Sequence, residues 1–158
     1  MDPISIFAGL SADRVGLRRK RRKVFVSYRR HLSWAQATLI YNDLTTHGFD
    51  AFMDLRDLDS GEFDRAILDQ IETRVHFVVL LVPGSLDRIT QEGDWLRREI
   101  AHALAHDRNV VPVTADGFKF GDLELPPDVA RLPKFNAVSI HPGYFDPAME
   151  LLRVRFLK

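Results

Sequence analysis

The sequence contains no cysteine, which excludes disulfide bonds, thiolate catalysis and cysteine-ligated zinc. It contains no apolar run of membrane-spanning length, and its first residues lack the basic and apolar regions of a secretory signal. We therefore expect a cytoplasmic protein with no membrane partner. At 158 residues, of which 46% are hydrophobic, the chain is long enough to bury one real core.

Several catalytic and nucleotide-binding motifs are also missing. The chain has no Gly-x-Gly-x-x-Gly fingerprint, no P-loop and no Gly-x-Ser-x-Gly nucleophile elbow. These absences argue against a Rossmann-type dinucleotide site, P-loop phosphoryl transfer and α/β-hydrolase chemistry. A phosphoacceptor receiver domain would need an aspartate at the end of its third strand, where this chain has Leu81-Val82-Pro83.

Basic residues are concentrated at the N-terminus, although the formal net charge is zero. Residues 1–23 hold seven basic and two acidic residues, which leaves 15 basic and 20 acidic residues for the remainder. We interpret residues 1–23 as a solvated basic arm or linker, with docking on another chain or on anionic material as the alternative. Residues 24–158 form one mildly acidic domain, for which charge gives no reason to expect nucleic-acid binding.

Short apolar runs alternate with amphipathic stretches in residues 24–158. The pattern predicts strands over residues 24–28, 49–53, 75–82, 109–114 and 137–140, and helices over residues 33–46, 63–74, 94–107 and 146–157. The run over 75–82 is nearly all apolar, as expected of a central parallel strand that is covered on both faces. This order is typical of a doubly wound α/β fold, in which ligands bind beyond the carboxyl ends of the strands.

The residues at these strand ends are therefore the first candidates for a binding site. The first strand ends at Tyr28-Arg29-Arg30, and the second at Asp54. Neighbours in an extended segment point to opposite sides, so one arginine can face a ligand phosphate while the other braces a loop. The alternative is a purely structural pair. The 54–63 connection is too long for a tight turn, which favours a lid or a contact surface.

The predicted helix over residues 94–107 carries the candidate catalytic acid. Trp95 and Glu99 are four residues apart on a face adjacent to the core-facing stripe, so the ring can hold the carboxylate in a dry cleft. The alternative is a surface helix with an ordinary glutamate. The core-facing stripe consists of Leu96, Ile100, Ala103 and Leu104.

His102 and His106 follow Glu99 on the same face of this helix. Two histidines four residues apart can bind zinc together. The chain lacks His-Glu-x-x-His, and the sequence offers no evident third ligand. We therefore favour a solvated polar face and predict no metal site.

Taken in order, the motifs resemble those of a TIR domain. The resemblance covers residues 24 to about 157 and is closest to the catalytic TIR domains that cleave NAD in animal axon degeneration and bacterial defence. It implies a flavodoxin-like α/β fold, with a five-stranded parallel sheet and helices on both faces. The motifs that carry it are Val24–Arg30, the 54–63 loop with Ser60-Gly61, Pro83–Leu86, Asp94–Glu99 and Val111–Val113.

The resemblance also implies roles for individual residues. Glu99 matches the catalytic glutamate of a Trp-x-x-x-Glu pattern. The residues implied to bind the substrate are Tyr28, Arg29, Arg30, Asp54, Phe63, Leu86, Trp95 and His141. A BB loop that gates the site and mediates assembly is implied to include Asp57, Leu58 and Gly61. The chain departs from the animal enzyme in its shorter segment between Leu86 and Trp95.

One carboxylate suffices for this reaction, because the cationic pyridinium departs as neutral nicotinamide and needs no general acid. We therefore expect an NAD+ hydrolase that uses no cofactor and yields nicotinamide with ADP-ribose or cyclic ADP-ribose. The expected partners are NAD+, other TIR domains in self-assemblies that include filaments, and a separate sensor or effector domain. The expected biological setting is bacterial immune defence. The alternatives are a non-enzymatic TIR scaffold and an enzyme that makes a signal for a separate effector.

Overall fold

The computed structural model describes residues 14–55 and 64–158. Residues 14–20 are helical and precede the sheet. The strands are β1 (Lys23–Tyr28), β2 (Asp50–Met53), β3 (His76–Leu81), β4 (Asn109–Thr114) and β5 (Val138–Ser139). The helices are α2 (Arg30–Thr46), α3 (Arg65–Glu72), α4 (Trp95–Ala105) and α5 (Phe145–Leu151), with a 3-10 turn (Leu132–Lys134) and a π-helical turn (Leu152–Phe156).

The five strands form one parallel sheet in the order β2-β1-β3-β4-β5. Val26 of β1 lies opposite Met53 on one side and Val78 on the other. Every residue of the central strand β3 is buried. These features confirm the predicted α/β fold and the predicted central position of the apolar run.

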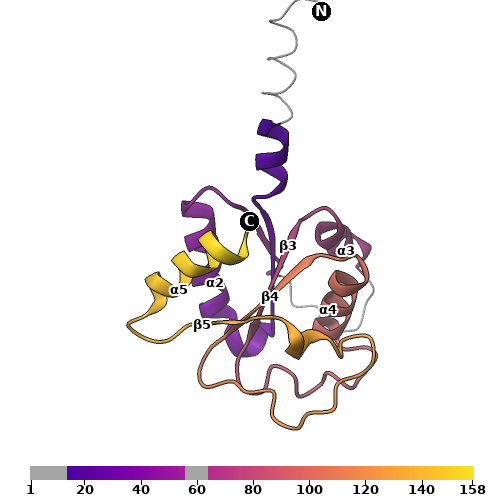
Figure 1. Cartoon of the computed structure of the whole chain (residues 1–158). Helices are drawn as coiled ribbons and strands as arrows, with labels where there is room; N and C mark the ends of the chain where they lie inside the picture. The colour runs from indigo at the N-terminus through magenta and orange to yellow at the C-terminus, as the bar shows by residue number, and fades with distance from the viewer. Residues whose placement is uncertain (1–13, 56–63) are drawn as a thin grey trace, which may run out of the picture.

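Helices cover both faces of the sheet, as Figure 1 shows, with α2 and α5 on one face and α3 and α4 on the other. Side chains of β1 alternate between the two cores. Val24 and Val26 pack with Ile40 and Leu44 of α2, whereas Phe25 packs with residues of α3 and α4. The domain therefore has a two-sided core, which fixes the sheet between its helical layers.

The first long helix begins earlier than its sequence pattern predicts. It starts at Arg30, and Ser33, predicted as its N-cap, lies inside it at a kink with φ −138° and ψ 23°. The Ser33 hydroxyl donates to the carbonyl oxygen of Arg29 at 3.2 Å, which is the local bonding that bends helices. Trp34, the next residue, is 60% exposed. The buried set is Ser33, Ala37, Ile40 and Leu44.

The other predicted elements are present; β4 has the predicted bounds, and the ends of the others differ by one to several residues. Asp64 caps α3 by accepting a hydrogen bond from the Ala66 N–H at 2.9 Å, so this helix begins after residue 63. Strand β1 begins at Lys23, which was assigned to the basic arm. Within the described residues, no helix has both the length and the apolar character that a membrane span requires.

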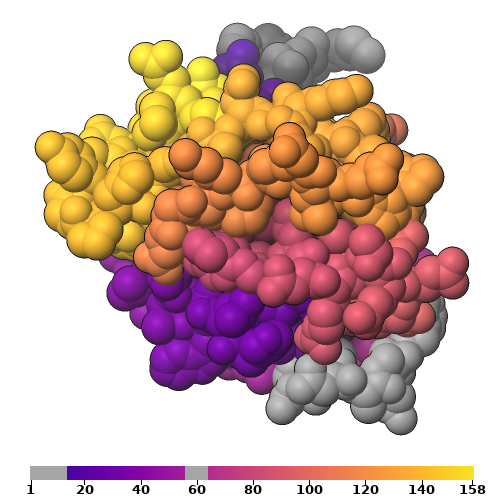
Figure 2. Space-filling view, turned by 90° about the horizontal axis from the view of Figure 1, so that it is seen from below, coloured from indigo at the N-terminus to yellow at the C-terminus, as the bar shows by residue number. Residues whose placement is uncertain are grey.

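The carboxyl ends of the strands lie at the lower edge of the sheet in Figure 1. Figure 2 looks onto this edge and shows the start of α2, the segment after β3 and the long loop after β4 side by side. These segments follow different strands, so residues far apart in sequence meet there. This is the edge at which the fold predicts a ligand site.

Candidate active site

Helix α4 begins at the sheet edge with Asp94 as its N-cap. The Asp94 carboxylate accepts a hydrogen bond from the Arg97 N–H at 3.3 Å. The first two turns of α4 then place both Trp95 and Glu99 in the interior, and Glu99 is only 3% exposed. The alternative of a surface helix with an ordinary glutamate is therefore wrong.

The carboxylate of Glu99 is held against β1. The Ser27 hydroxyl donates to Glu99 Oε2 at 2.5 Å, and Arg30 Nη2 lies 3.8 Å from Glu99 Oε1. Sequence reasoning missed Ser27, because a serine inside a buried strand gives no signal of its partner on a distant helix. Its position between Val26 and Tyr28, beside the two arginines, was the available hint.

Burial strongly perturbs the ionisation of this acid. It raises the pKa of Glu99 to about 7 from an ordinary value of 4.5. The Ser27 hydrogen bond and the Arg30 charge oppose the rise, and the Asp54 carboxylate adds to it. Near neutral pH, Glu99 is therefore present in both its protonated and its ionised form.

The two consecutive arginines have different partners. Arg29 is buried, and its Nη1 and Nη2 donate to the Asp94 carboxylate at 2.5 and 2.9 Å. Its Nε and Nη2 donate to the Ser85 carbonyl oxygen at 3.0 and 2.8 Å. Arg29 thus braces the turn after β3 and the start of α4, as predicted for one member of the pair.

Arg30 points to the other side of the chain. Its Nη2 donates to Asp54 Oδ2 at 2.9 Å, and the same atom lies near Glu99. The Tyr28 hydroxyl donates to the Asp54 carbonyl oxygen at 2.8 Å, while burial raises the pKa of that phenol. Tyr28, Arg30, Asp54 and Glu99 therefore form one connected group at the ends of β1 and β2.

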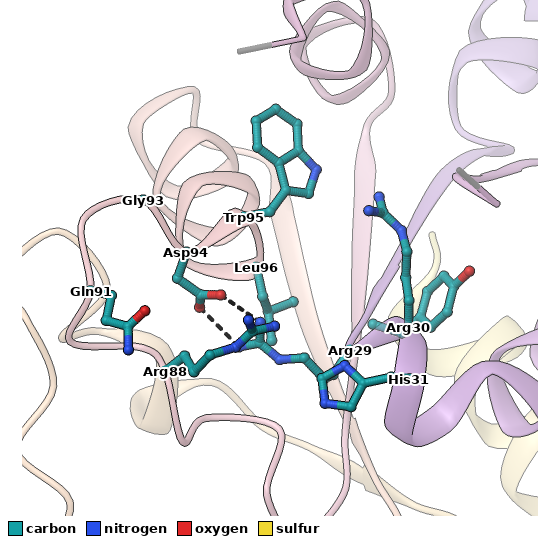
Figure 3. A pocket seen from close by; sticks show the side chains of 10 residues that line it. Arg29, Arg30, His31, Arg88, Gln91, Gly93, Asp94, Trp95 and Leu96 are labelled. Carbon is teal, nitrogen blue, oxygen red and sulfur yellow. Dashed lines mark hydrogen bonds and ion pairs between the residues drawn. The ribbon is translucent and has the colours of Figure 1, made fainter. Parts of the chain in front are cut away.

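A pocket of about 210 Å³ opens beside this group (Figure 3). Arg29, Arg30, His31 and Arg88 line it, and Arg29 and Arg30 form ion pairs with Asp94 and Asp54, respectively. The indole N–H of Trp95, a lining residue, is buried and makes no hydrogen bond of good geometry within residues 14–55 and 64–158, although it lies close enough to the Glu99 carboxylate to help lower the pKa of that acid. The residues that line the pocket are Tyr28, Arg29, Arg30, His31, Arg88, Gln91, Gly93, Asp94, Trp95 and Leu96.

The fold brings together only some of the predicted site residues. Tyr28, Arg29, Arg30 and Trp95 line the pocket, and Asp54 and Glu99 adjoin it through Arg30. Leu86 lies in the core below a different cavity, beside Phe118 and Phe120. His141 is exposed after β5 and does not line the pocket. Phe63 and the BB-loop residues Asp57, Leu58 and Gly61 lie outside the described residues.

Sequence reasoning did not assign six of the lining residues to the site: His31, Arg88, Gln91, Gly93, Asp94 and Leu96. His31 directly follows the Arg29-Arg30 pair, which was the one available signal. Arg88 and Gln91 lie in the segment between β3 and α4, where no periodic pattern separates inward from outward side chains.

The fold and the site define an α/β domain in which a buried glutamate lies beside an arginine-lined pocket at the carboxyl edge of the sheet. The chain belongs to the TIR domain family, whose model matches residues 24–152.

Three curated proteins that are similar in sequence to this chain are each named as an NAD(+) hydrolase. The NAD(+) hydrolase tir-1 of Caenorhabditis elegans is 34% identical over 148 residues, covering 90% of this chain and 15% of that protein. The NAD(+) hydrolase sarm1 of Drosophila melanogaster is 35% identical over 143 residues, covering 88% and 10%. The NAD(+) hydrolase SARM1 of Danio rerio is 32% identical over 139 residues, covering 85% and 19%. The chain therefore spans only about a tenth to a fifth of the length of these relatives.

Solved structures show the same fold. A metazoan TIR-STING receptor from C. gigas, in complex with 2',3'-cGAMP, superposes with a TM-score of 0.59 at 23% identity, covering 84% of this chain and 39% of that one. The TIR domains of the activated Roq1 resistosome superpose with a TM-score of 0.60 at 17% identity, covering 82% and 96%. At these identities the likeness concerns the fold alone.

The perturbed ionisation of Glu99 predicts a pH-dependent stability. Between about pH 4.5 and 7, the unfolded chain has released the Glu99 proton while the folded protein still holds it. The contribution of this proton to the free energy of unfolding is therefore fully present below pH 4.5 and is lost as the pH rises to 7. Across that window we expect the free energy of unfolding of Glu99→Gln to rise by about 3 kcal/mol relative to the wild type. Urea unfolding at several pH values measures this. Glu150→Gln, which alters an exposed carboxyl, is the control, and a constant difference for Glu99→Gln would contradict the assignment.

The buried pair predicts that Arg29 is needed for folding. Arg29→Gln leaves the Asp94 carboxylate buried without its cation, which should lower the free energy of unfolding by about 3–5 kcal/mol. Arg155→Gln, at an exposed arginine, should change it by less than about 0.5 kcal/mol. Urea unfolding at pH 7 compares the two variants. Equal midpoints would show that the pair does not stabilise the site.

Proposed function

We propose that this chain hydrolyses NAD+ at the bond between nicotinamide and ribose, with Glu99 as the catalytic carboxylate. The observation that carries the proposal is the burial of Glu99, held by Ser27 and next to Arg30, at the carboxyl edge of the sheet. The names of the curated relatives support the same reaction.

Glu99 acts in its ionised form in this mechanism. As the bond to nicotinamide breaks, the bonding electrons leave with the pyridinium, which becomes neutral nicotinamide, and positive charge develops on the ribose. A carboxylate in a water-poor site stabilises that charge. Water then adds to the ribose and loses a proton, which gives ADP-ribose. The approach of the cationic pyridinium also favours the ionised form of Glu99, whose pKa is raised to about 7.

The pocket beside Arg30 fits the phosphate-bearing part of the substrate. We assign the pyrophosphate to Arg30, with Arg88 and His31 at the rim, because guanidinium groups bind phosphate oxygens well. The bonds from Arg29 to Asp94 and Ser85 favour a structural role for Arg29 over the predicted role in binding.

The size of the pocket favours assembly as a requirement for activity. At about 210 Å³ it is smaller than the roughly 300–1,000 Å³ of typical ligand sites, and a dinucleotide exceeds it. We propose that a second copy of the chain contributes to the site, in an immune-defence setting, and that the products are nicotinamide and ADP-ribose or its cyclic form.

The carboxylate should be essential for cleavage. Glu99→Gln keeps the size of the side chain but removes its negative charge, so nicotinamide release should fall at least about a hundredfold. Chromatographic measurement of nicotinamide tests this, and the same traces distinguish linear from cyclic ADP-ribose. Glu150→Gln should match the wild type. If folded Glu99→Gln cleaves NAD+ at the wild-type rate, Glu99 is not catalytic. If the wild type releases no nicotinamide even at high protein concentration, the result favours the alternative of a non-enzymatic scaffold.

Assembly should make the specific activity depend on protein concentration. Nicotinamide released per chain should rise steeply as the chain is concentrated, because a neighbour completes the site. A dilution series, measured in parallel by light scattering, tests this. A specific activity that stays flat while scattering reports a change from monomer to oligomer would contradict it.

A further inference from the structure

Two histidines of α4 meet a carboxylate of α3 on the side of α4 that faces this helix. Glu72 is the last residue of α3, and His106 is the C-cap of α4. His102 Nε2 lies 2.8 Å from Glu72 Oε1, and His106 Nε2 lies 3.5 Å from the same oxygen. The three ligand atoms all lie within 4.8 Å of one another. No other group of three histidine or acidic side chains in the described part of the chain has this geometry.

We propose that Glu72, His102 and His106 form a binding site for a divalent transition-metal ion, for which Zn²⁺ is the best match. The sequence showed the two histidines but not the third ligand, because Glu72 lies 30 residues before His102 on another helix. Packing of α3 beside α4 supplies it (Figure 1). The site is separate from the pocket beside Arg30 and does not depend on the proposed hydrolase activity.

The spacing of the donor atoms suits a tetrahedral ion. In a tetrahedral site, two ligand atoms that each lie about 2.0–2.1 Å from zinc are about 3.3 Å apart. This separation lies between the 2.8 and 3.5 Å at which His102 Nε2 and His106 Nε2 lie from Glu72 Oε1. Two imidazoles and one carboxylate leave the fourth position for water, as in many zinc sites with three protein ligands. Mg²⁺ and Ca²⁺ prefer sets of oxygen ligands, so this donor set selects against them.

The orientation of His106 prepares it for coordination. Its Nδ1 lies 2.9 Å from the carbonyl oxygen of His102, so in the neutral ring Nδ1 carries the proton and Nε2 the lone pair. Metal-binding histidines are typically oriented by such a second hydrogen bond. The ends of two helices also contribute, because Glu72 and His106 lie at helix C-termini, where the helix dipoles favour a cation.

Two arginines place positive charge near this position, and one of them, Arg108, donates to the backbone carbonyl oxygens of His106 and Glu72 at 2.9 and 3.0 Å. Arg65 Nη2 contacts Glu72 Oε1 at 2.7 Å, and its Nε contacts Asp69 at 2.8 Å. The Arg65 side chain is more than half exposed, so it can leave Glu72 while it keeps Asp69. The charge of Arg65 should therefore weaken metal binding without preventing it.

Calorimetric titration of the chelator-treated chain with ZnCl₂, without a histidine tag, tests the proposal. The wild type should bind one Zn²⁺ per chain, and His106→Gln should weaken the affinity at least about tenfold. His47→Gln, at the end of α2, should leave it unchanged. Arg65→Gln should bind more tightly than the wild type, since it removes the competing charge. All four proteins should have the same circular dichroism in chelator.

Thermal unfolding gives a second readout. With Zn²⁺ at a hundred times its Kd, the Tm of the wild type should rise by about 5–10 °C, and chelator should reverse the rise. Mg²⁺ at the same concentration should leave it unchanged. The proposal is overturned if the wild type shows no saturable one-to-one binding, or if folded His106→Gln binds Zn²⁺ as the wild type does.

Discussion

A buried ion pair between Arg29 and Asp94 holds together the segments from which the candidate active site is built. Arg29 ends β1, Asp94 starts α4, and the same guanidinium binds the Ser85 carbonyl oxygen in the turn after β3. Each partner would be costly to bury alone, so the three segments are stable only in one relative position. That position sets where α4 begins, and therefore where the side chain of Glu99 lies.

The acid itself shows how burial and hydrogen bonding balance each other. Removal from water favours the protonated form of Glu99, whereas the hydroxyl of Ser27 and the charge of Arg30 favour the carboxylate. The result is a group that is easily deprotonated near neutral pH but is poorly solvated in either form. A poorly solvated carboxylate interacts strongly with a nearby positive charge, which is the property required to stabilise a ribosyl cation.

The sequence predicted burial best where it follows from the apolar pattern of a single helix or strand. The stripe of Leu96, Ile100 and Leu104 and the apolar run of β3 follow local periodicity, and both were predicted correctly. The start of α2 was predicted at residue 33 and not at Arg30, because a side-chain bond to the Arg29 carbonyl oxygen bends the helix at Ser33.

Contacts between distant elements lay beyond such reasoning. Ser27 meets Glu99, and Glu72 meets His102, only after helices pack on the sheet and on each other. Neither Ser27 nor Glu72 stands out in its own segment. The assignment of Glu99 came from the Trp-x-x-x-Glu pattern and its family resemblance, and the structure then added the burial that the pattern alone left open.

The support of Glu99 by β1 and α4 has an evolutionary consequence. The long connection between β4 and β5 forms much of the carboxyl edge of the sheet, yet none of its residues contacts the Glu99 carboxylate among the hydrogen bonds and ion pairs of the described residues. Insertions and deletions in its exposed stretch, residues 121–124, can reshape the surroundings of the pocket without moving the acid. Members of such a family can therefore diverge in the ligands and neighbours that they accept while they retain the same reactive group.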